Sequence, residues 1–156
     1  MKSVICLFTP QDKLGLVAAI NAVCAEGCWM RTLRYEPTPA WEHALDHPDC
    51  PDHLLLVVQD QSQVVGWCRT FPMNCRDGVA TASLGVGLLP DYRDRGIGTA
   101  LIRTSLKWAN DAGLVWVQLT TRTDNQRAIH VFRKCGFDQT GNGHNGTLEM
   151  AVELGE

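Results

Sequence analysis

The chain has 156 residues, of which 45% are apolar and 20% charged, a composition typical of a soluble globular domain with a full core. Its net charge is −3 and it contains no run of like charges, which argues against a dedicated nucleic-acid or membrane-surface binder. The apolar stretch at the N-terminus is too short for a secretory signal. We therefore expect a cytoplasmic protein in which residues 1–156 form a single domain.

Hydrophobic periodicity and turn residues predict the elements of the first half of the chain. In chain order these are a strand over Val4–Phe8, a helix whose apolar stripe runs from Leu14 to Cys24 and ends near Gly27, a helix over Pro39–Leu45, and hairpin strands over His53–Gln59 and Val64–Phe71. The connector Cys28–Pro37 mixes aromatic and charged residues. A ligand contact and simple packing on the sheet are equally consistent with that mixture.

The second half alternates strands and helices. In chain order the expected elements are a strand over Val79–Leu89, a helix ended by Gly113, a strand over Leu114–Thr120, a helix within Thr123–Phe137 ended by Gly136, a glycine-rich hairpin loop around 141–146, and a closing strand over Thr147–Leu154. The strand after Gly113 is almost continuously apolar, which predicts a central position in the sheet.

A loop between a strand and a helix, Arg93-Asp-Arg-Gly-Ile-Gly98, has the features of an anion site. A helix start leaves several backbone N–H groups without partners and carries the positive end of the helix dipole, so it can hold a phosphate. Gly96 and Gly98 let the backbone approach a ligand closely. Arg93 and Arg95 add positive charge. A dinucleotide fingerprint does not fit, because its third glycine is absent, and no Gly-Lys-Ser/Thr tripeptide of a nucleotide-triphosphate loop occurs.

A second motif follows about thirty residues later: Asn125-x-x-Ala-Ile-x-x-Phe132-x-Lys-x-Gly-Phe137. The pair of motifs, in this order and spacing, resembles the acyl-CoA-binding pattern of the GCN5-related N-acetyltransferase (GNAT) family. The resemblance implies an α/β (α+β) fold. Its mixed, mostly antiparallel sheet would have six or seven strands, flanked by about four helices, with two central parallel strands splayed where the ligand enters.

The resemblance also implies an activity and roles for particular residues. The activity is transfer of an acetyl group from acetyl-CoA to a primary amine by direct attack in a ternary complex, without a metal. The loop would hold the CoA pyrophosphate, the strand end would pair with the pantetheine arm, and the backbone amide of Leu88 would donate to the oxyanion. The implied cofactor-binding residues are Gly87, Leu88, Leu89, Arg93, Arg95, Gly96, Ile97, Gly98, Thr99, Asn125 and Phe132.

Two departures from the family pattern leave the proton transfers open. Phe132 stands where many relatives have a proton-donating Tyr, and Ser83 lies near the usual position of a Glu that acts as base. Acetyl transfer stays feasible because a thiolate of pKa about 8.5 is a tolerable leaving group and water can supply its proton. Candidates for the base, on chemistry alone, are Glu36, His130, His144 and Glu149.

The acceptor and the partners are only weakly indicated. Arg31 and Arg34 could bind a carboxylate, whereas Glu36 and Glu42 could attract a cation or a peptide N-terminus. A small molecule is slightly favoured over a protein N-terminus, and a homodimer is left open. The missing Tyr and Glu also suit a different class of protein, a non-catalytic acyl-CoA-binding sensor or interaction module.

Four potential metal ligands lie close together in the sequence: His43, His47, Cys50 and His53. Imidazole and thiolate groups are zinc ligands, but the two prolines of this segment prevent one continuous helix, and the spacing matches no zinc signature. The sequence therefore favours a solvated loop without a metal. The seven cysteines include no Cys-x-x-Cys pair and are expected to be reduced, small apolar side chains.

Overall fold

A computed structural model describes residues 2–30, 32–73 and 80–155 of the chain. Within these ranges the elements are β1 (Val4–Leu7), η1 (Pro10–Asp12), α1 (Lys13–Ala25), α2 (Pro39–Asp46), β2 (Leu54–Asp60), β3 (Gln63–Pro72), β4 (Thr81–Leu88), η2 (Pro90–Tyr92), α3 (Ile97–Asp111), β5 (Trp116–Arg122), α4 (Gln126–Lys134), β6 (Asp138–Asn142) and β7 (Thr147–Glu153). Residue 79, where the sequence places the start of a strand, lies outside the described residues.

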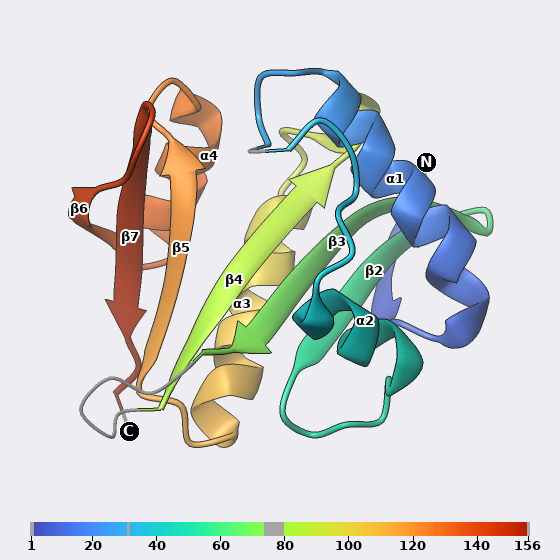
Figure 1. The fold of residues 1–156 in the computed structure, drawn as a ribbon, viewed down its shortest axis with the longest axis horizontal. Coiled ribbons are helices and arrows are strands. Elements are labelled where there is room, and N and C mark those ends of the chain that lie inside the picture. Colours follow the sequence, from blue (N-terminus) through green and yellow to red (C-terminus); the bar gives the residue numbers. More distant parts are fainter. Residues whose placement is uncertain (1, 31, 74–79, 156) are drawn as a thin grey trace.

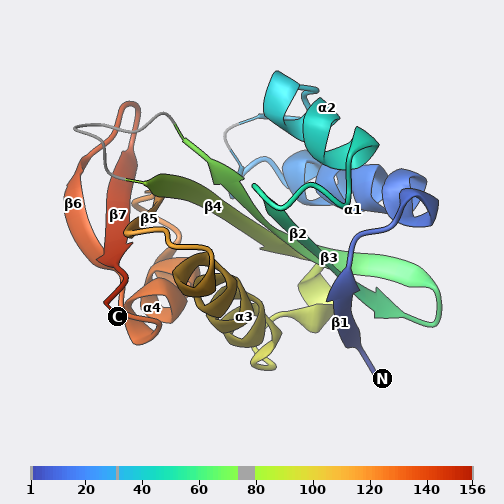
Figure 2. The ribbon, with the colours of Figure 1, turned by 90° about the horizontal axis from the view of Figure 1, so that it is seen from below.

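Seven strands of the described chain form one sheet in the order β1-β2-β3-β4-β5-β7-β6. Every neighbouring pair is antiparallel except β4 and β5, which are parallel. Helices α1 and α2 cover one face of the sheet, and α3 and α4 cover the other (Figure 2). This arrangement confirms the predicted fold class and the central position of β5.

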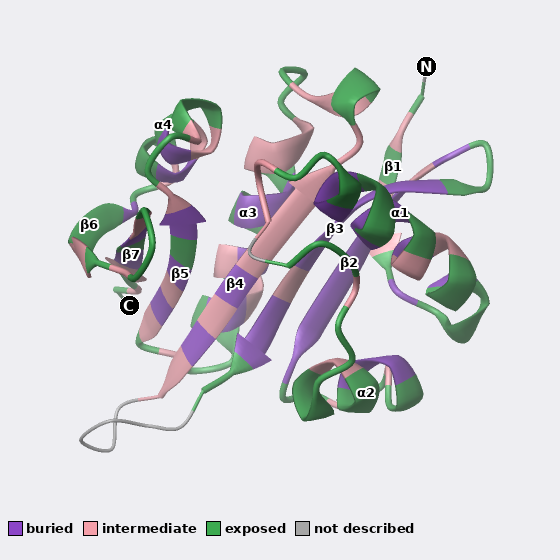
Figure 3. Cartoon of the chain, turned by 45° about the horizontal axis from the view of Figure 1, so that its top comes forward, coloured by how far each residue is buried: buried purple, intermediate pink, exposed green. Residues whose placement is uncertain are grey.

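Strand β2 shows why the sheet is buried on both faces. Leu54, Leu56 and Val58 pack with α3 and α4, whereas Leu55 and Val57 pack with α1 and α2. Successive side chains of a strand point to opposite faces, so a strand covered on both sides reads as one continuous apolar run. The burial pattern along β2 and β3 is visible in Figure 3.

Local signals set the helix ends. The side chain of Thr38 accepts a hydrogen bond from Trp41 N at 3.2 Å, and Pro39 occupies the first turn of α2, as expected for a helix start. Gly113 and Gly136 follow the ends of α3 and α4 with φ of 84° and 101°, the left-handed conformation that favours glycine.

One predicted helix face and one strand boundary are corrected. Leu14, which the sequence assigns to the apolar stripe of α1, is 85% exposed, and Leu16 is fully buried instead. The buried side chains of α1 recur at 16, 19, 20 and 23, and at 100° per residue Leu14 falls away from that face. Strand β5 begins at Trp116 rather than Leu114 and continues to Arg122.

The parallel strands diverge near the middle of the sheet. Strands β4 and β5 pair only over Thr81–Ser83 and Trp116–Gln118. Beyond this point β4 stays paired with β3 as far as Leu88, and β5 stays paired with β7 as far as Arg122. The two halves of the sheet therefore separate toward the strand ends, as Figure 1 shows, and the predicted splay is confirmed.

Candidate active site

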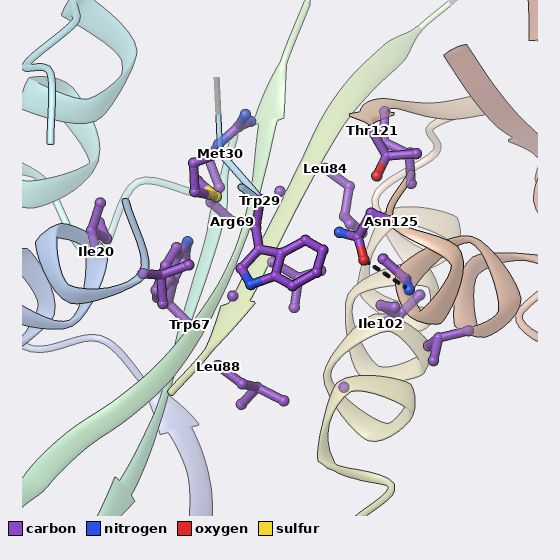
Figure 4. A pocket seen from close by; sticks show the side chains of 18 of the residues that line it. Ile20, Trp29, Met30, Trp67, Arg69, Leu84, Leu88, Ile102, Thr121 and Asn125 are labelled. Carbon is purple, nitrogen blue, oxygen red and sulfur yellow. Dashed lines mark hydrogen bonds between the residues drawn. The ribbon is translucent and has the colours of Figure 1, made fainter. Parts of the chain in front are cut away.

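A cavity of about 650 Å³ opens where β4 and β5 separate. Its walls come from β3, β4 and the start of α3 on one side, from β5 and α4 on the other, and from the connector between α1 and α2 (Figure 4). Its volume is within the range typical of small-molecule sites. The splay thus creates a site of ligand size lined by the two sequence motifs.

The edge of β4 that faces the gap is open beyond Ser83. The amide of Leu89 donates to Val65 O on the β3 side at 2.9 Å, and β4 pairs with β3 without a register shift. Because alternate residues of a strand direct their amides to opposite edges, the amides of Val86 and Leu88 point toward β5. They meet no strand of the described ranges there, since the pairing with β5 stops at Ser83.

The start of α3 lies beside this open edge. Gly96 precedes the helix with φ of 81°, and the bond from Ala100 N to its carbonyl, at 3.1 Å, begins the helical ladder. The amides of residues 97–99 therefore have no acceptor within the helix. A Cβ atom on Gly98 would lie 3.8 Å from the Leu88 side chain. A helix start of the kind that can hold an anion and an open strand edge thus border one cavity.

Arg93 holds the loop in place. Its Nε donates to Leu88 O at 3.0 Å, and its two terminal nitrogens donate to the carboxylate of Glu26 at 2.9 and 2.7 Å. These bonds lower the pKa of the Glu26 carboxyl, although partial burial opposes the shift. The charge of Arg93 is therefore neutralised by the end of α1. Arg95, by contrast, is exposed, and its Cζ lies 6.0 Å from the centroid of the Tyr92 ring.

Most of the residues implied by the family pattern meet at the cavity. Those that line it are Gly87, Leu88, Arg93, Gly96, Gly98, Thr99, Asn125 and Phe132, whereas Leu89, Arg95 and Ile97 lie outside the lining. The Asn125 side chain accepts a hydrogen bond from Ala128 N at 3.3 Å and so caps α4. Phe132 is 5% exposed and packs against Phe137, with the ring centroids 5.9 Å apart.

Arg69 is a site residue that the motifs do not identify. It lies on β3, and its Nη1 donates to Ser83 O and Oγ at 3.4 and 3.3 Å. Gly85 leaves room for it, since a Cβ atom there would come within 2.9 Å of Arg69 Nε. Burial lowers the pKa of the guanidinium, and no carboxylate of the described chain lies within ion-pair distance.

The sequence does hold a weak signal for Arg69. It is the one charged residue of the run Val64–Phe71, and its neighbours Trp67 and Phe71 on the same strand face are buried. A charged side chain between two buried aromatics is unusual. Only the pairing of Arg69 with Gly85 on β4 places it at the cavity wall.

The connector contributes an aromatic wall. The indole of Trp29 points into the cavity between Leu88 and Asn125 (Figure 4), and its Nε1 donates to Glu26 Oε1 at 2.9 Å. Met30 and Tyr35 line the cavity and also pack against the core under α1 and α2. The connector therefore both packs on the sheet and borders the ligand space.

Of the candidate bases and the charged residues considered for binding the acceptor, one that the structure describes lines the cavity. Glu36 is exposed and lines the cavity. The other three candidate bases are exposed and lie outside the lining: His130, His144 and Glu149. Arg34 and Glu42 are also exposed and outside it, and Arg31 lies outside the described residues.

The described ranges contain no helix that combines the length and the apolar character needed to cross a bilayer.

The fold and the site define a class of mixed α/β proteins in which a ligand cavity opens between two splayed parallel strands, beside a glycine loop at a helix start. The model of the acetyltransferase (GNAT) family matches residues 18–137, and the chain belongs to this family.

Individual relatives share between about a fifth and a third of their aligned residues with this chain. A mycothiol acetyltransferase of Pseudarthrobacter chlorophenolicus is 32% identical over 89 residues, which cover 56% of this chain and 28% of that protein. A GNAT-family acetyltransferase structure from Streptococcus pneumoniae has a TM-score of 0.85 at 22% identity, covering 99% of this chain and 100% of the other. A phosphinothricin acetyltransferase from Sinorhizobium meliloti, solved with acetyl-CoA, has a TM-score of 0.80 at 19% identity, covering 100% and 90%.

Proposed function

We propose that this chain transfers an acetyl group from acetyl-CoA to a primary amine. The observation that carries the proposal is that two features border the same cavity: the amides of the first turn of α3, which have no acceptor within the helix, and the open edge of β4. A helix start stabilises a phosphate group, and an unpaired strand edge accepts an extended amide chain. Coenzyme A combines a pyrophosphate with an amide-bearing arm, and the Sinorhizobium relative of the same fold was solved with acetyl-CoA.

The loop and the end of β4 have separate roles in this proposal. The amides of residues 95–99 hold the pyrophosphate, and Arg95 adds positive charge from outside the cavity. Arg93 fixes the loop through Glu26 and Leu88 O. The pantetheine arm pairs with the edge presented by Val86 and Leu88, while the neighbouring residues Gly87 and Leu89 direct their amides to β3.

The Leu88 amide donates to the oxyanion that forms when the amine attacks the thioester carbonyl. Asn125, which caps α4 at the far wall, keeps that helix start beside the cofactor, and Phe132 packs near the sulfur. The attacking amine must lose a proton, and Glu36 is the candidate base that lines the cavity. Phe132 has no proton to donate, so water protonates the departing thiolate.

The acceptor in this proposal is a small amine that carries an anionic group. Arg69 presents a half-buried guanidinium at the cavity wall and has no acidic partner in the described chain. A charge withdrawn from water is costly unless it is paired. A carboxylate or similar group on the acceptor would pair with Arg69, which favours a small molecule over a protein N-terminus.

The test is acetyl transfer from acetyl-CoA to matched amines, each an amino acid and its carboxamide, followed by mass spectrometry of the acetylated product. We expect the KM of the carboxylate form to be about 10- to 100-fold lower than that of the carboxamide. This ratio corresponds to the free energy that a hydrogen bond to a charged group usually contributes. Arg69→Gln should remove this difference, and Arg34→Gln, outside the cavity, should preserve it.

Two negative results have different meanings. Binding of acetyl-CoA without transfer to any amine would overturn the transferase proposal and favour a non-catalytic acyl-CoA-binding module. Transfer without preference for the carboxylate form would retain the transferase and reject the role of Arg69.

A further inference from the structure

A cluster of nitrogen and sulfur donors lies outside the cavity, between α2 and the start of β2. His43 is an exposed residue of α2, Cys50 lies in the loop after α2, and His53 immediately precedes β2. One ligand atom from each of the three lies within 4.8 Å of the others. His47, one helical turn after His43, has its ring centroid 4.8 Å from that of His43.

His53 is the unusual member of this cluster. It is only 6% exposed, and its Nδ1 is buried without a hydrogen-bond partner in the described chain. A buried polar atom left unpaired destabilises a fold, and most such atoms in proteins have a partner. The His53 ring stands edge-on to that of His43, with centroids 5.8 Å apart.

The sequence argues against a metal because its spacing fits no zinc signature. The loop after α2 shows how these residues meet despite that spacing. Helix α2 stops at Asp46, before both prolines, so the segment is not one continuous helix. The chain then turns back, with Cys50 N donating to His47 O at 3.1 Å. This turn returns Cys50 and His53 to the side of α2 that carries the other two histidines. The spacing matches no common motif, yet the donors converge.

We propose that His43, Cys50 and His53 bind a zinc ion, with His47 completing a tetrahedral site. Zinc bonds of about 2.0–2.3 Å place the donors of a tetrahedral site roughly 3.5 Å apart. The observed spacing of 4.8 Å or less therefore closes by about 1 Å when the side chains rotate onto the ion. His43 and His47 are exposed and Cys50 is half-buried, so three of the four side chains have room to rotate.

The site would be structural. Its ligands join α2 to the start of β2, and α2 carries Trp41, which lines the cavity and packs on Phe71 with ring centroids 5.1 Å apart. Phe71 in turn lies 6.2 Å from the ring of His53. A zinc ion would therefore fix the wall of the cavity that α2 supplies. This inference stands on the donor cluster and does not depend on acetyl transfer.

The experiment is zinc titration of untagged, chelator-treated protein against a chromophoric competitor, together with substitution by Co²⁺. We expect one equivalent of zinc per chain, thiolate-to-Co²⁺ charge-transfer absorption, and a higher thermal midpoint with zinc. Cys50→Ser should abolish that absorption and weaken zinc binding by at least about 100-fold, the upper end of what loss of a residue supporting a metal ligand costs. His43→Gln should also weaken it.

The matched control is Cys135→Ser, which removes another partly buried cysteine on the opposite side of the sheet and should leave zinc binding unchanged. If Cys50→Ser does not fold, His43→Gln keeps the test valid because His43 is exposed. Two results would overturn the proposal. One is wild-type protein that shows no Co²⁺–thiolate absorption, and the other is wild-type protein that binds zinc no more tightly than Cys50→Ser or, if that variant does not fold, than His43→Gln.

Discussion

The carboxylate of Glu26 accepts two hydrogen bonds from the guanidinium of Arg93, at 2.9 and 2.7 Å. Glu26 is the residue at the end of α1, and Arg93 opens the loop that leads to α3. The pair is 67 residues apart in sequence. It joins the helical layer on one face of the sheet to the loop that borders the cavity.

Replacing Glu26 by Gln should lower the free energy of unfolding by about 1 kcal/mol. Charge-assisted hydrogen bonds contribute about 1.5–3 kcal/mol, but the Glu26 side chain is 25% exposed, which weakens the interaction. Urea unfolding at neutral pH measures the change. The control is Asp111→Asn, which breaks the exposed pair with Lys107 and should change stability by less than about 0.5 kcal/mol.

The same pair predicts a pH dependence. Arg93 lowers the folded-state pKa of Glu26 from its ordinary value of 4.5, so the unfolded chain takes up the proton first as pH falls. The stabilisation is therefore complete well above pH 4.5 and disappears as pH drops through the folded-state pKa. The difference in unfolding free energy between wild type and Glu26→Gln should shrink below pH 4.5. A difference that stays constant from pH 7 to pH 3 would contradict this account.

Gly98 tests the proposed pyrophosphate site. Its α-carbon faces Leu88 across the start of the cavity, where a Cβ atom fits at 3.8 Å. Gly98→Ala should therefore be tolerated, whereas the branched side chain of Gly98→Val should block close approach of a ligand to the helix start. We expect Gly98→Val to weaken CoA binding by about tenfold or more in calorimetry. Unchanged affinity in a folded Gly98→Val variant would place the pyrophosphate elsewhere.

The sequence predicts some parts of this site and not others because they depend on different distances along the chain. The glycine loop and the Asn125 cap are local patterns. Their residues and the helices that they begin can therefore be predicted from a short stretch of sequence. The position of Arg69 depends on its pairing with Gly85 across two strands. The hydrogen bonds between Glu26 and Arg93, and the approach of Cys50 to His43, depend on how the chain folds back in three dimensions. Hydrophobic periodicity does not predict such contacts.

Glu36 is the candidate base, and its removal should slow acetyl transfer. A general base typically contributes about 10²- to 10⁴-fold, so Glu36→Gln should lower kcat by at least about 100-fold when proton removal limits the rate. The neighbouring control is Glu42→Gln, since Glu42 is exposed on α2 and lies outside the cavity lining. Equal rates for wild type and Glu36→Gln would show that the amine loses its proton to another group.

Cys68 should be inert in the folded protein. It is fully buried, and burial raises the pKa of its thiol to about 12 despite a contact with Ser105 Oγ at 3.3 Å. The thiolate is the reactive form, so iodoacetamide at pH 8 should leave Cys68 unmodified while the partly exposed Cys28 reacts. Mass spectrometry of the digested protein measures both sites. Labelling of Cys68 at the rate of Cys28 would mean that this part of the core opens readily.

Phe132 offers a gain-of-function test of the proposed mechanism. Its ring lines the cavity and is 5% exposed, at the position where the family resemblance implies a proton-donating Tyr in many relatives. Phe132→Tyr adds a hydroxyl that can protonate the departing thiolate if it reaches the sulfur. General acid catalysis contributes about 10²- to 10⁴-fold, but the surrounding side chains are not arranged around a hydroxyl. We therefore expect a smaller gain, of about tenfold or less.

The measurement is pre-steady-state acetyl transfer by wild type and Phe132→Tyr with one acceptor, under conditions in which the chemical step limits the rate. Phe137→Tyr is the control, because Phe137 packs against Phe132 but is 1% exposed and lies outside the cavity lining. A hydroxyl there should lower stability without raising the rate, since a buried polar group needs a partner. Equal rates for wild type and Phe132→Tyr would mean that Phe132 does not face the sulfur or that another group already supplies the proton.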